Sequence, residues 1–141
     1  MKKVILLFAV GLITFTANAQ KMNEADVPAA VKATFAKAYP NTKAGWEKEN
    51  GNYEAGFTAN KIEMSVLIDP SGNITETETE IKVSELSKII TDYCAKNYPD
   101  KKIAEASKII DAKGIITYEA EINKMDVLFS ADGKFIKESK D

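Results

Sequence analysis

The side chains of this sequence that could do chemistry are mainly carboxylates. Glu54 and Glu119 hold equivalent positions in two similar segments, NYEAGF (52–57) and TYEAEI (117–122). A pair of carboxyl groups can perform acid/base chemistry of the kind used in glycoside hydrolysis, provided that a cleft raises the pKa of one of them. No feature of the sequence indicates such a cleft, so we expect that the protein is not an enzyme.

The basic residues narrow the chemistry further. All 19 are lysine, and the chain has neither histidine nor arginine. The usual general base near neutral pH, the commonest metal ligand and the bidentate phosphate clamp are therefore missing. With a formal net charge of −2, the chain is also a poor candidate for binding nucleic acid, because that binding depends on neutralising phosphates.

Cys94 is the only cysteine, so the chain can form neither an intramolecular disulfide nor a Cys/His nucleophile. It falls on the apolar face of a predicted helix. We expect it to be a small core residue.

Three further carboxylates alternate with threonine in TETETEI (75–81). Glu76, Glu78 and Glu80 would project from one side of a strand, where carboxylate oxygens could recruit calcium. The glycine-punctuated spacing of known calcium loops is missing, and a solvated strand that links two halves of the chain explains the pattern as well. We predict no metal site and no cofactor.

The first 19 residues have the form of a signal peptide. Lys2 and Lys3 precede an apolar run over residues 4–15, and Ala17-Asn18-Ala19 is a cleavage signature. The run is shorter than the ~20 apolar residues that cross a bilayer. We expect cleavage near Ala19–Gln20, export to the periplasm or the medium, and no membrane insertion of the mature chain.

An internal repeat organises the remaining residues. AKAYP (36–40) returns as AKNYP (95–99), and each copy closes a stretch with apolar residues at helical spacing. Asp26 and Ser84 are the expected N-caps, and Tyr-Pro ends each helix because the residue before proline leaves the helical region. We predict a single domain over 20–141, made of two repeats at about 25–80 and 83–141.

After each helix the apolar period changes from 3.6 to 2. Tyr53, Ala55 and Phe57 alternate with polar residues and are followed by a second alternating run, which indicates an antiparallel hairpin with one buried face. Each repeat is then one helix followed by about four antiparallel strands, an α+β arrangement in which the helix covers one sheet face. Parity along its strand turns Trp46 inward, toward the core.

The same alternation assigns a second face, which we expect to be open. Acidic residues surround two leucines on it, and such a surface could dock a basic partner. The alternative is an ordinary wetted sheet face. This face carries Glu47 and Glu49, and its candidate binding residues are Glu54, Glu63, Leu67, Glu119, Glu121, Asp126 and Leu128.

Paired signatures point to a known family. Each copy contains a helix, Tyr-Pro, Tyr-Glu-Ala, Val-Leu-Ile or Val-Leu-Phe, and a glycine turn, DPSG (69–72) or ADGK (131–134). With a signal peptide in front, the chain resembles the PepSY-like, β-lactamase-inhibitor-like (BLIP-like) exported proteins. The resemblance implies tandem units that form one sheet with the helices packed on one face, and no enzyme activity. The inhibitor has disulfides within its units, and this chain has only Cys94, so we carry over no inhibitory residue.

The sequence therefore predicts a non-catalytic exported binding module that binds or inhibits a protein or peptide through the open sheet face. The alternative function is a calcium sensor or buffer that uses the acidic residues of the same face.

Overall fold

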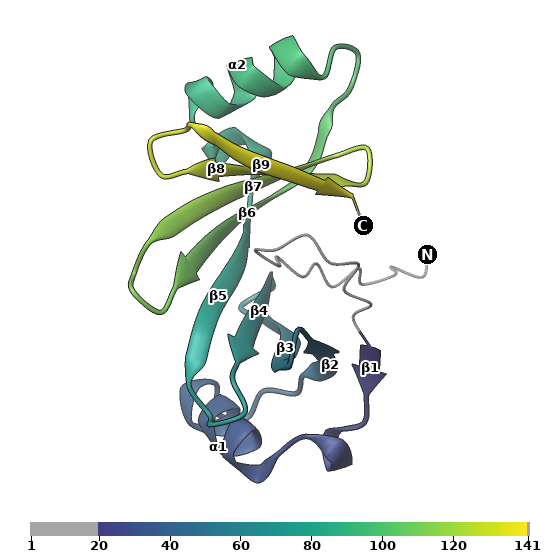
Figure 1. Cartoon of the computed structure of the whole chain (residues 1–141), viewed down its shortest axis with the longest axis vertical. Helices are drawn as coiled ribbons and strands as arrows, with labels where there is room; N and C mark the ends of the chain where they lie inside the picture. Colours follow the sequence, from purple (N-terminus) through teal and green to yellow (C-terminus); the bar gives the residue numbers. More distant parts are fainter. Residues whose placement is uncertain (1–19, 141) are drawn as a thin grey trace. The chain divides into compact units, whose positions relative to one another are not determined.

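The structure is a computed structural model that describes residues 20–140; the expected signal peptide, residues 1–19, lies outside the described part. Over residues 20–140 the chain forms nine strands, hydrogen-bonded in chain order from β1 to β9, with two α-helices and two short 3-10 turns (Figure 1). The strands are β1 (Gln20–Met22), β2 (Gly45–Glu49), β3 (Asn52–Ala59), β4 (Ile62–Ile68), β5 (Ile74–Ile81), β6 (Ile103–Asp111), β7 (Ile116–Ile122), β8 (Met125–Ser130) and β9 (Phe135–Lys140). The helices are α1 (Ala29–Ala38) and α2 (Lys88–Asn97), and the 3-10 turns are η1 (Glu24–Asp26) and η2 (Val83–Glu85). The predicted α+β fold with one antiparallel sheet is confirmed.

The chain divides into two compact units, Met1–Thr75 and Glu76–Asp141. Unit 1 contains α1 with β1 to β4 and the start of β5, and unit 2 contains the rest of β5, α2 and β6 to β9. Each unit has a hydrophobic core of its own.

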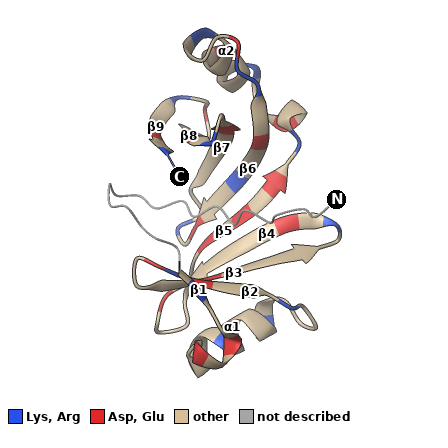
Figure 2. Ribbon diagram, turned by 90° about the vertical axis from the view of Figure 1, so that its right-hand side faces the viewer, with Lys and Arg blue, Asp and Glu red and all other residues tan. Residues whose placement is uncertain are grey.

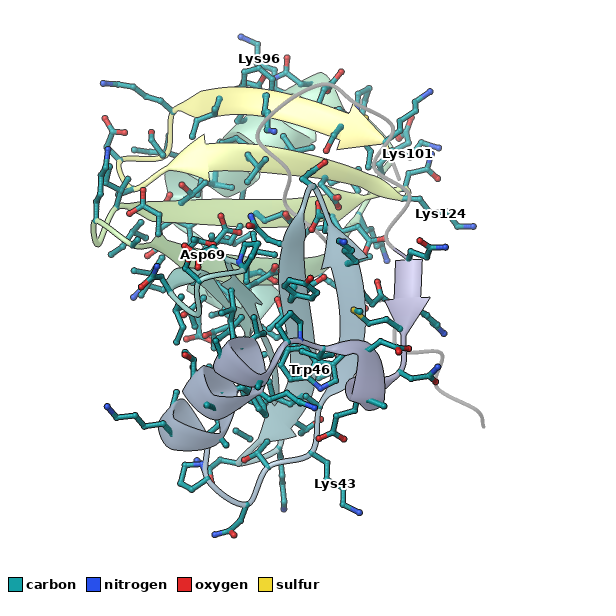
Figure 3. All side chains as sticks on the ribbon, turned by 60° about the horizontal axis from the view of Figure 1, so that its bottom comes forward. Lys43, Trp46, Asp69, Lys96, Lys101 and Lys124 are labelled. Atoms are coloured by element: carbon teal, nitrogen blue, oxygen red, sulfur yellow. The ribbon has the colours of Figure 1, made fainter. Side chains whose placement is uncertain are left out.

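In unit 1, helix α1 covers one face of the strands. Val31 and Phe35 are its buried residues, and the Phe35 ring lies 5.5 Å from the Trp46 ring and 5.2 Å from that of Phe57. Figure 3 shows Trp46 beneath the helix. Trp46 is 6% exposed, so the prediction that it faces the core is confirmed.

Unit 2 repeats this packing with α2. Ile90 and Cys94 are its buried residues, and the ring of Tyr93 lies 5.4 Å from that of Phe129. Cys94 is 3% exposed, which confirms it as a core residue.

Both helices begin later than the sequence predicts. Asp26 ends η1, the extended Val27 follows, and Pro28 holds the N-cap position of α1. Ser84 lies inside η2, which the Glu85 carboxylate stabilises by accepting a hydrogen bond from the Lys82 backbone N–H at 2.8 Å. These turns use residues that the helical period includes, so Asp26 and Ser84 are not N-caps.

The N-cap of α2 is Ser87, whose Oγ accepts from the Ile90 N–H at 3.4 Å. Strand β1 was not predicted either. It has only three residues, too few to show an alternating pattern, and is held by its pairing with β2.

Both predicted glycine turns form, and in each the glycine has a positive φ. Gly72 and Gly133 have φ of +88° and +83°, a conformation that glycine adopts without a steric penalty. Each turn is closed by a hydrogen bond from the glycine N–H, to Asp69 O at 2.9 Å and to Ser130 O at 2.8 Å.

Candidate binding site

The strand face of unit 1 that points away from α1 carries one cross-strand row. Its members, as successive register partners from β1 to β4, are Lys21, Glu47, Glu54 and Leu67. Their neighbours in register, Trp46, Ala55 and Val66, belong to the core under the helix, so the row lies on the opposite face. Directly opposite side chains in an antiparallel pair lie about 5 Å apart and interact.

Unit 2 carries a comparable row on the face away from α2. Its members, as successive partners from β5 to β9, are Glu80, Ser107, Glu119, Leu128 and Lys137. Each unit therefore contains the same kind of cross-strand pair, a glutamate opposite a leucine: Glu54 opposite Leu67 in unit 1, and Glu119 opposite Leu128 in unit 2. We call the strand face that carries each row the second face of its unit.

Like charges oppose one another on both second faces. Glu47 is the register partner of Glu54 in unit 1, and Glu121 is the partner of both Asp126 and Glu105 in unit 2. Directly opposed like charges destabilise a sheet. The arrangement thus concentrates negative charge on the face that the helix leaves uncovered.

The crowding of carboxyl groups on the second face of unit 1 affects the pKa of Glu49. Burial raises the pKa of its carboxyl group above the usual range, and the neighbouring Glu47 raises it further. Both residues lie on β2 two positions apart, so their side chains share the second face. The Asn50 side-chain amide donates to Glu49 Oε1 at 3.4 Å.

The second faces are more covered than the sequence predicts. Glu54, Glu119, Asp126 and Leu128 are each only 3% exposed, and Glu47 and Glu49 are also buried, which corrects the expectation of an open face. Alternation assigns a side chain to a face but does not show how its neighbours cover it. All seven candidate residues lie on inner strands, but Leu67 and Glu121 are half-buried and Glu63, near the end of its strand, is exposed.

Two residues of the rows were missed by the sequence analysis. Lys21 and Lys137 end the rows of units 1 and 2, and both lie on outer strands, β1 and β9. The alternating pattern around Lys137 could have placed it on this face, but β1 is too short to give such a signal.

The remaining carboxylates do not assemble into a metal centre. Within residues 20–140 no group of three His, Cys, Asp or Glu side chains is placed to hold a metal ion. Glu76, Glu78 and Glu80 pair with Asp111, Ile109 and Ser107 across β5 and β6. The Asn73 backbone N–H and side-chain amide both donate to the Asp69 carboxylate and lower its pKa. The Asp69 carboxylate therefore stabilises the β4–β5 turn in which it lies.

Comparisons with known proteins agree with this fold. A family model described as "Putative beta-lactamase-inhibitor-like, PepSY-like" matches the chain over residues 14–76 and again over 51–137. A comparison with curated proteins finds none that matches. No helix among the described residues is long and apolar enough to cross a membrane.

Solved structures of Bacteroides proteins share the fold. A protein from Bacteroides eggerthii, described as one of the "putative periplasmic proteins", is 16% identical with a TM-score of 0.70, over 80% of this chain and 88% of the other. A DUF2874 family protein from Bacteroides uniformis is 20% identical with a TM-score of 0.68, over 79% and 88%.

A BLIP-like protein from Bacteroides fragilis is 23% identical with a TM-score of 0.56, over 78% of this chain and 83% of the other. The two family-model matches together span residues 14–137, which is most of the chain. The chain therefore belongs to the family of β-lactamase-inhibitor-like, PepSY-like proteins.

Proposed function

We propose that the protein is a non-catalytic exported binding module that binds a basic protein or peptide through its second faces. The proposal rests on one observation: both units contain the same arrangement of acidic side chains, which destabilises the sheet. In each unit a glutamate faces a leucine across the strands, and directly opposed acidic side chains lie on the same face. A basic partner would relieve the repulsion between these side chains.

The proposal keeps the seven candidate residues, three on the second face of unit 1 and four on that of unit 2, and divides their roles. Glu63, Leu67 and Glu121 are accessible enough to touch a partner. Glu54, Glu119 and Asp126 are buried, where an ionised carboxylate is costly unless a cation is close, so a basic partner would stabilise their charged form. Leu128 supports Glu119 from the neighbouring strand.

The partner chemistry follows from this division. Lysine or arginine side chains would supply the complementary charge, and an apolar side chain beside them would cover Leu67. The family description, β-lactamase-inhibitor-like, is compatible with a protein ligand. A calcium sensor or buffer stays the alternative prediction; among residues 20–140 no three carboxylates are grouped to hold a metal ion.

The proposal is tested by charge reversal at accessible positions. The tagged protein and its Glu63→Lys/Glu121→Lys variant are used to capture partners from envelope extract and culture medium. A matched control, Glu24→Lys/Asp92→Lys, makes the same change in net charge at exposed positions, one in each unit and outside the second faces. We expect the parent and the control to retain a basic partner that the Glu63/Glu121 variant loses. Capture of the same proteins by all three would contradict the proposal.

A further inference from the structure

Two hairpin turns that hold a lysine at positive φ indicate a second candidate binding surface. The β3–β4 turn has φ of 51° at Asn60 and 67° at Lys61, and the β7–β8 turn has 55° at Asn123 and 61° at Lys124. Such hairpin turns favour asparagine followed by glycine, as this chain itself uses at Asn50–Gly51. Lysine in the left-handed region carries a conformational penalty. Its presence in both repeats therefore suggests that a positive charge is useful at these turns.

In unit 2, more lysines gather around this turn. Ile103 pairs with Ile122, which places Lys101 and Lys102 next to the turn, and Lys140 pairs with Met125, the residue after Lys124. Lys96 lies in the last turn of α2, and the Lys101 N–H donates to Tyr98 O at 3.2 Å. Lys101 and Lys124 lie on the same side of unit 2 in Figure 3. We call this set the basic end: Lys101, Lys102, Lys124 and Lys140.

All four lysines of the basic end are exposed. The acidic residues next to these lysines in the sequence are Asp100, which precedes Lys101, and Glu138 and Asp141, on either side of Lys140. The Glu138 carboxylate accepts a hydrogen bond from the Tyr98 hydroxyl. Glu121 and Asp126 lie further in, on the second face. The lysines of the basic end outnumber the acidic residues next to them in the sequence, although the chain as a whole is negative, and Figure 2 shows lysines in blue on the segment that leads from α2 to β6.

Unit 1 has a smaller counterpart. Lys37 lies in the last turn of α1, Lys43 precedes β2, and Lys61 occupies the β3–β4 turn. These positions correspond to Lys96, Lys102 and Lys124 in the repeat. The lysines thus recur at the same end of both units.

We infer that the basic end of unit 2 binds the surface of an anionic lipid bilayer. Lysine carries a compact charge on a flexible stem and makes no bidentate fork, which suits diffuse attraction to many headgroups better than recognition of one phosphate. Lysines held close to an anionic lipid surface are attracted to it electrostatically, and the attraction grows with each lysine. The four lysines come from three separate segments, which gives a broad contact rather than a pocket. This inference does not depend on the proposed protein-binding face.

The experiment is cosedimentation of the purified protein with vesicles. One set contains phosphatidylcholine and about 30% phosphatidylglycerol, and the other contains phosphatidylcholine alone. We expect binding to the anionic vesicles only, falling steeply between low and physiological salt. Each lysine near an anionic surface contributes about fivefold in affinity, so Lys101→Glu/Lys124→Glu should weaken binding by at least about 25-fold.

A matched control reverses two exposed lysines in other loops of unit 2, Lys113→Glu/Lys134→Glu, and should bind anionic vesicles within about twofold of the parent. A third variant, Lys124→Gly, distinguishes the effect of losing the lysine charge from an effect of destabilising the fold. Glycine adopts the positive φ of this turn without strain, so the unfolding midpoint of the Lys124→Gly variant should equal or exceed that of the parent. Its affinity for anionic vesicles should fall about fivefold.

The inference is overturned by any of three results. These are no binding to the anionic vesicles at low salt, equal losses in the test and control variants, or complete competition by millimolar inorganic phosphate. The last result would indicate a discrete phosphate site instead of a lipid surface.

Discussion

The Thr34 hydroxyl of α1 donates a hydrogen bond to the backbone carbonyl of Gly72 at 2.6 Å, and so fastens the β4–β5 turn to the helix. A Cβ added at Gly72 would lie 3.1 Å from Ala30 O, which is helix backbone and cannot move aside cheaply. In unit 2 the same turn meets α2, where a Cβ at Gly133 would lie 3.0 Å from Ile89 Cγ2. Close approach of a glycine turn to the helix is therefore a shared means of fixing each helix on its strands.

Gly72→Ala should destabilise the protein by about 2 to 4 kcal/mol, because it adds a backbone clash to the cost of a positive φ. Gly114→Ala is the matched control, since Gly114 has φ of +79° and nothing within 4 Å of its added Cβ. The control should cost only about 1 kcal/mol. Urea unfolding measures both, and equal losses would show that contact with α1 adds nothing.

Tyr98 and Glu138 join the end of α2 to the edge strand β9. Partial burial raises the pKa of Tyr98 above its usual value, and the hydrogen bond to Glu138 raises it further. Tyr98→Phe should cost about 1.5 kcal/mol, the usual contribution of a hydrogen bond to a charged group. The counterpart Tyr39 packs its ring 4.4 Å from that of Phe57, so Tyr39→Phe, which keeps the ring, should cost less. Hydrogen exchange of β9 amides should quicken in the Tyr98 variant only.

The tandem fold could be predicted because its signals are local and occur twice. Tyr-Pro ends both helices, and alternation around Tyr53 and Trp46 gives the correct faces. The helix starts could not be predicted, since η2 is held by a contact between Lys82 and Glu85 that competes with the helical period. The burial of Glu54 and Glu119 could not be predicted either, because the alternating pattern assigns a side chain to a face but does not show which neighbouring side chains cover it.

The pH dependence of stability should report the crowded carboxylates on β2. Burial and the nearby Glu47 raise the pKa of Glu49, so the folded protein holds this proton more tightly than the unfolded chain does. Between the ordinary value of 4.5 and the raised value, the folded state binds more protons, and the free energy of unfolding should fall as pH rises.

Glu49→Gln should remove this part of the slope and raise the free energy of unfolding at pH 7. Denaturant unfolding from pH 4.5 to pH 7 measures the effect. Glu24→Gln, an exposed glutamate outside the second face, should leave stability within about 0.5 kcal/mol of the parent at every pH. A Glu49→Gln protein with an unchanged pH profile would show that Glu49 is ionised without penalty.

The most direct measurement of the central claim is calorimetric titration of the captured partner into the parent and into Glu54→Gln/Glu119→Gln. These substitutions remove charge from both repeats with little change in side-chain shape, and circular dichroism checks that the fold is kept. If the second faces bind a basic partner, affinity should fall by about tenfold or more, with a weaker dependence on salt. Affinity and salt dependence equal to those of the parent would contradict the assignment of binding to these faces.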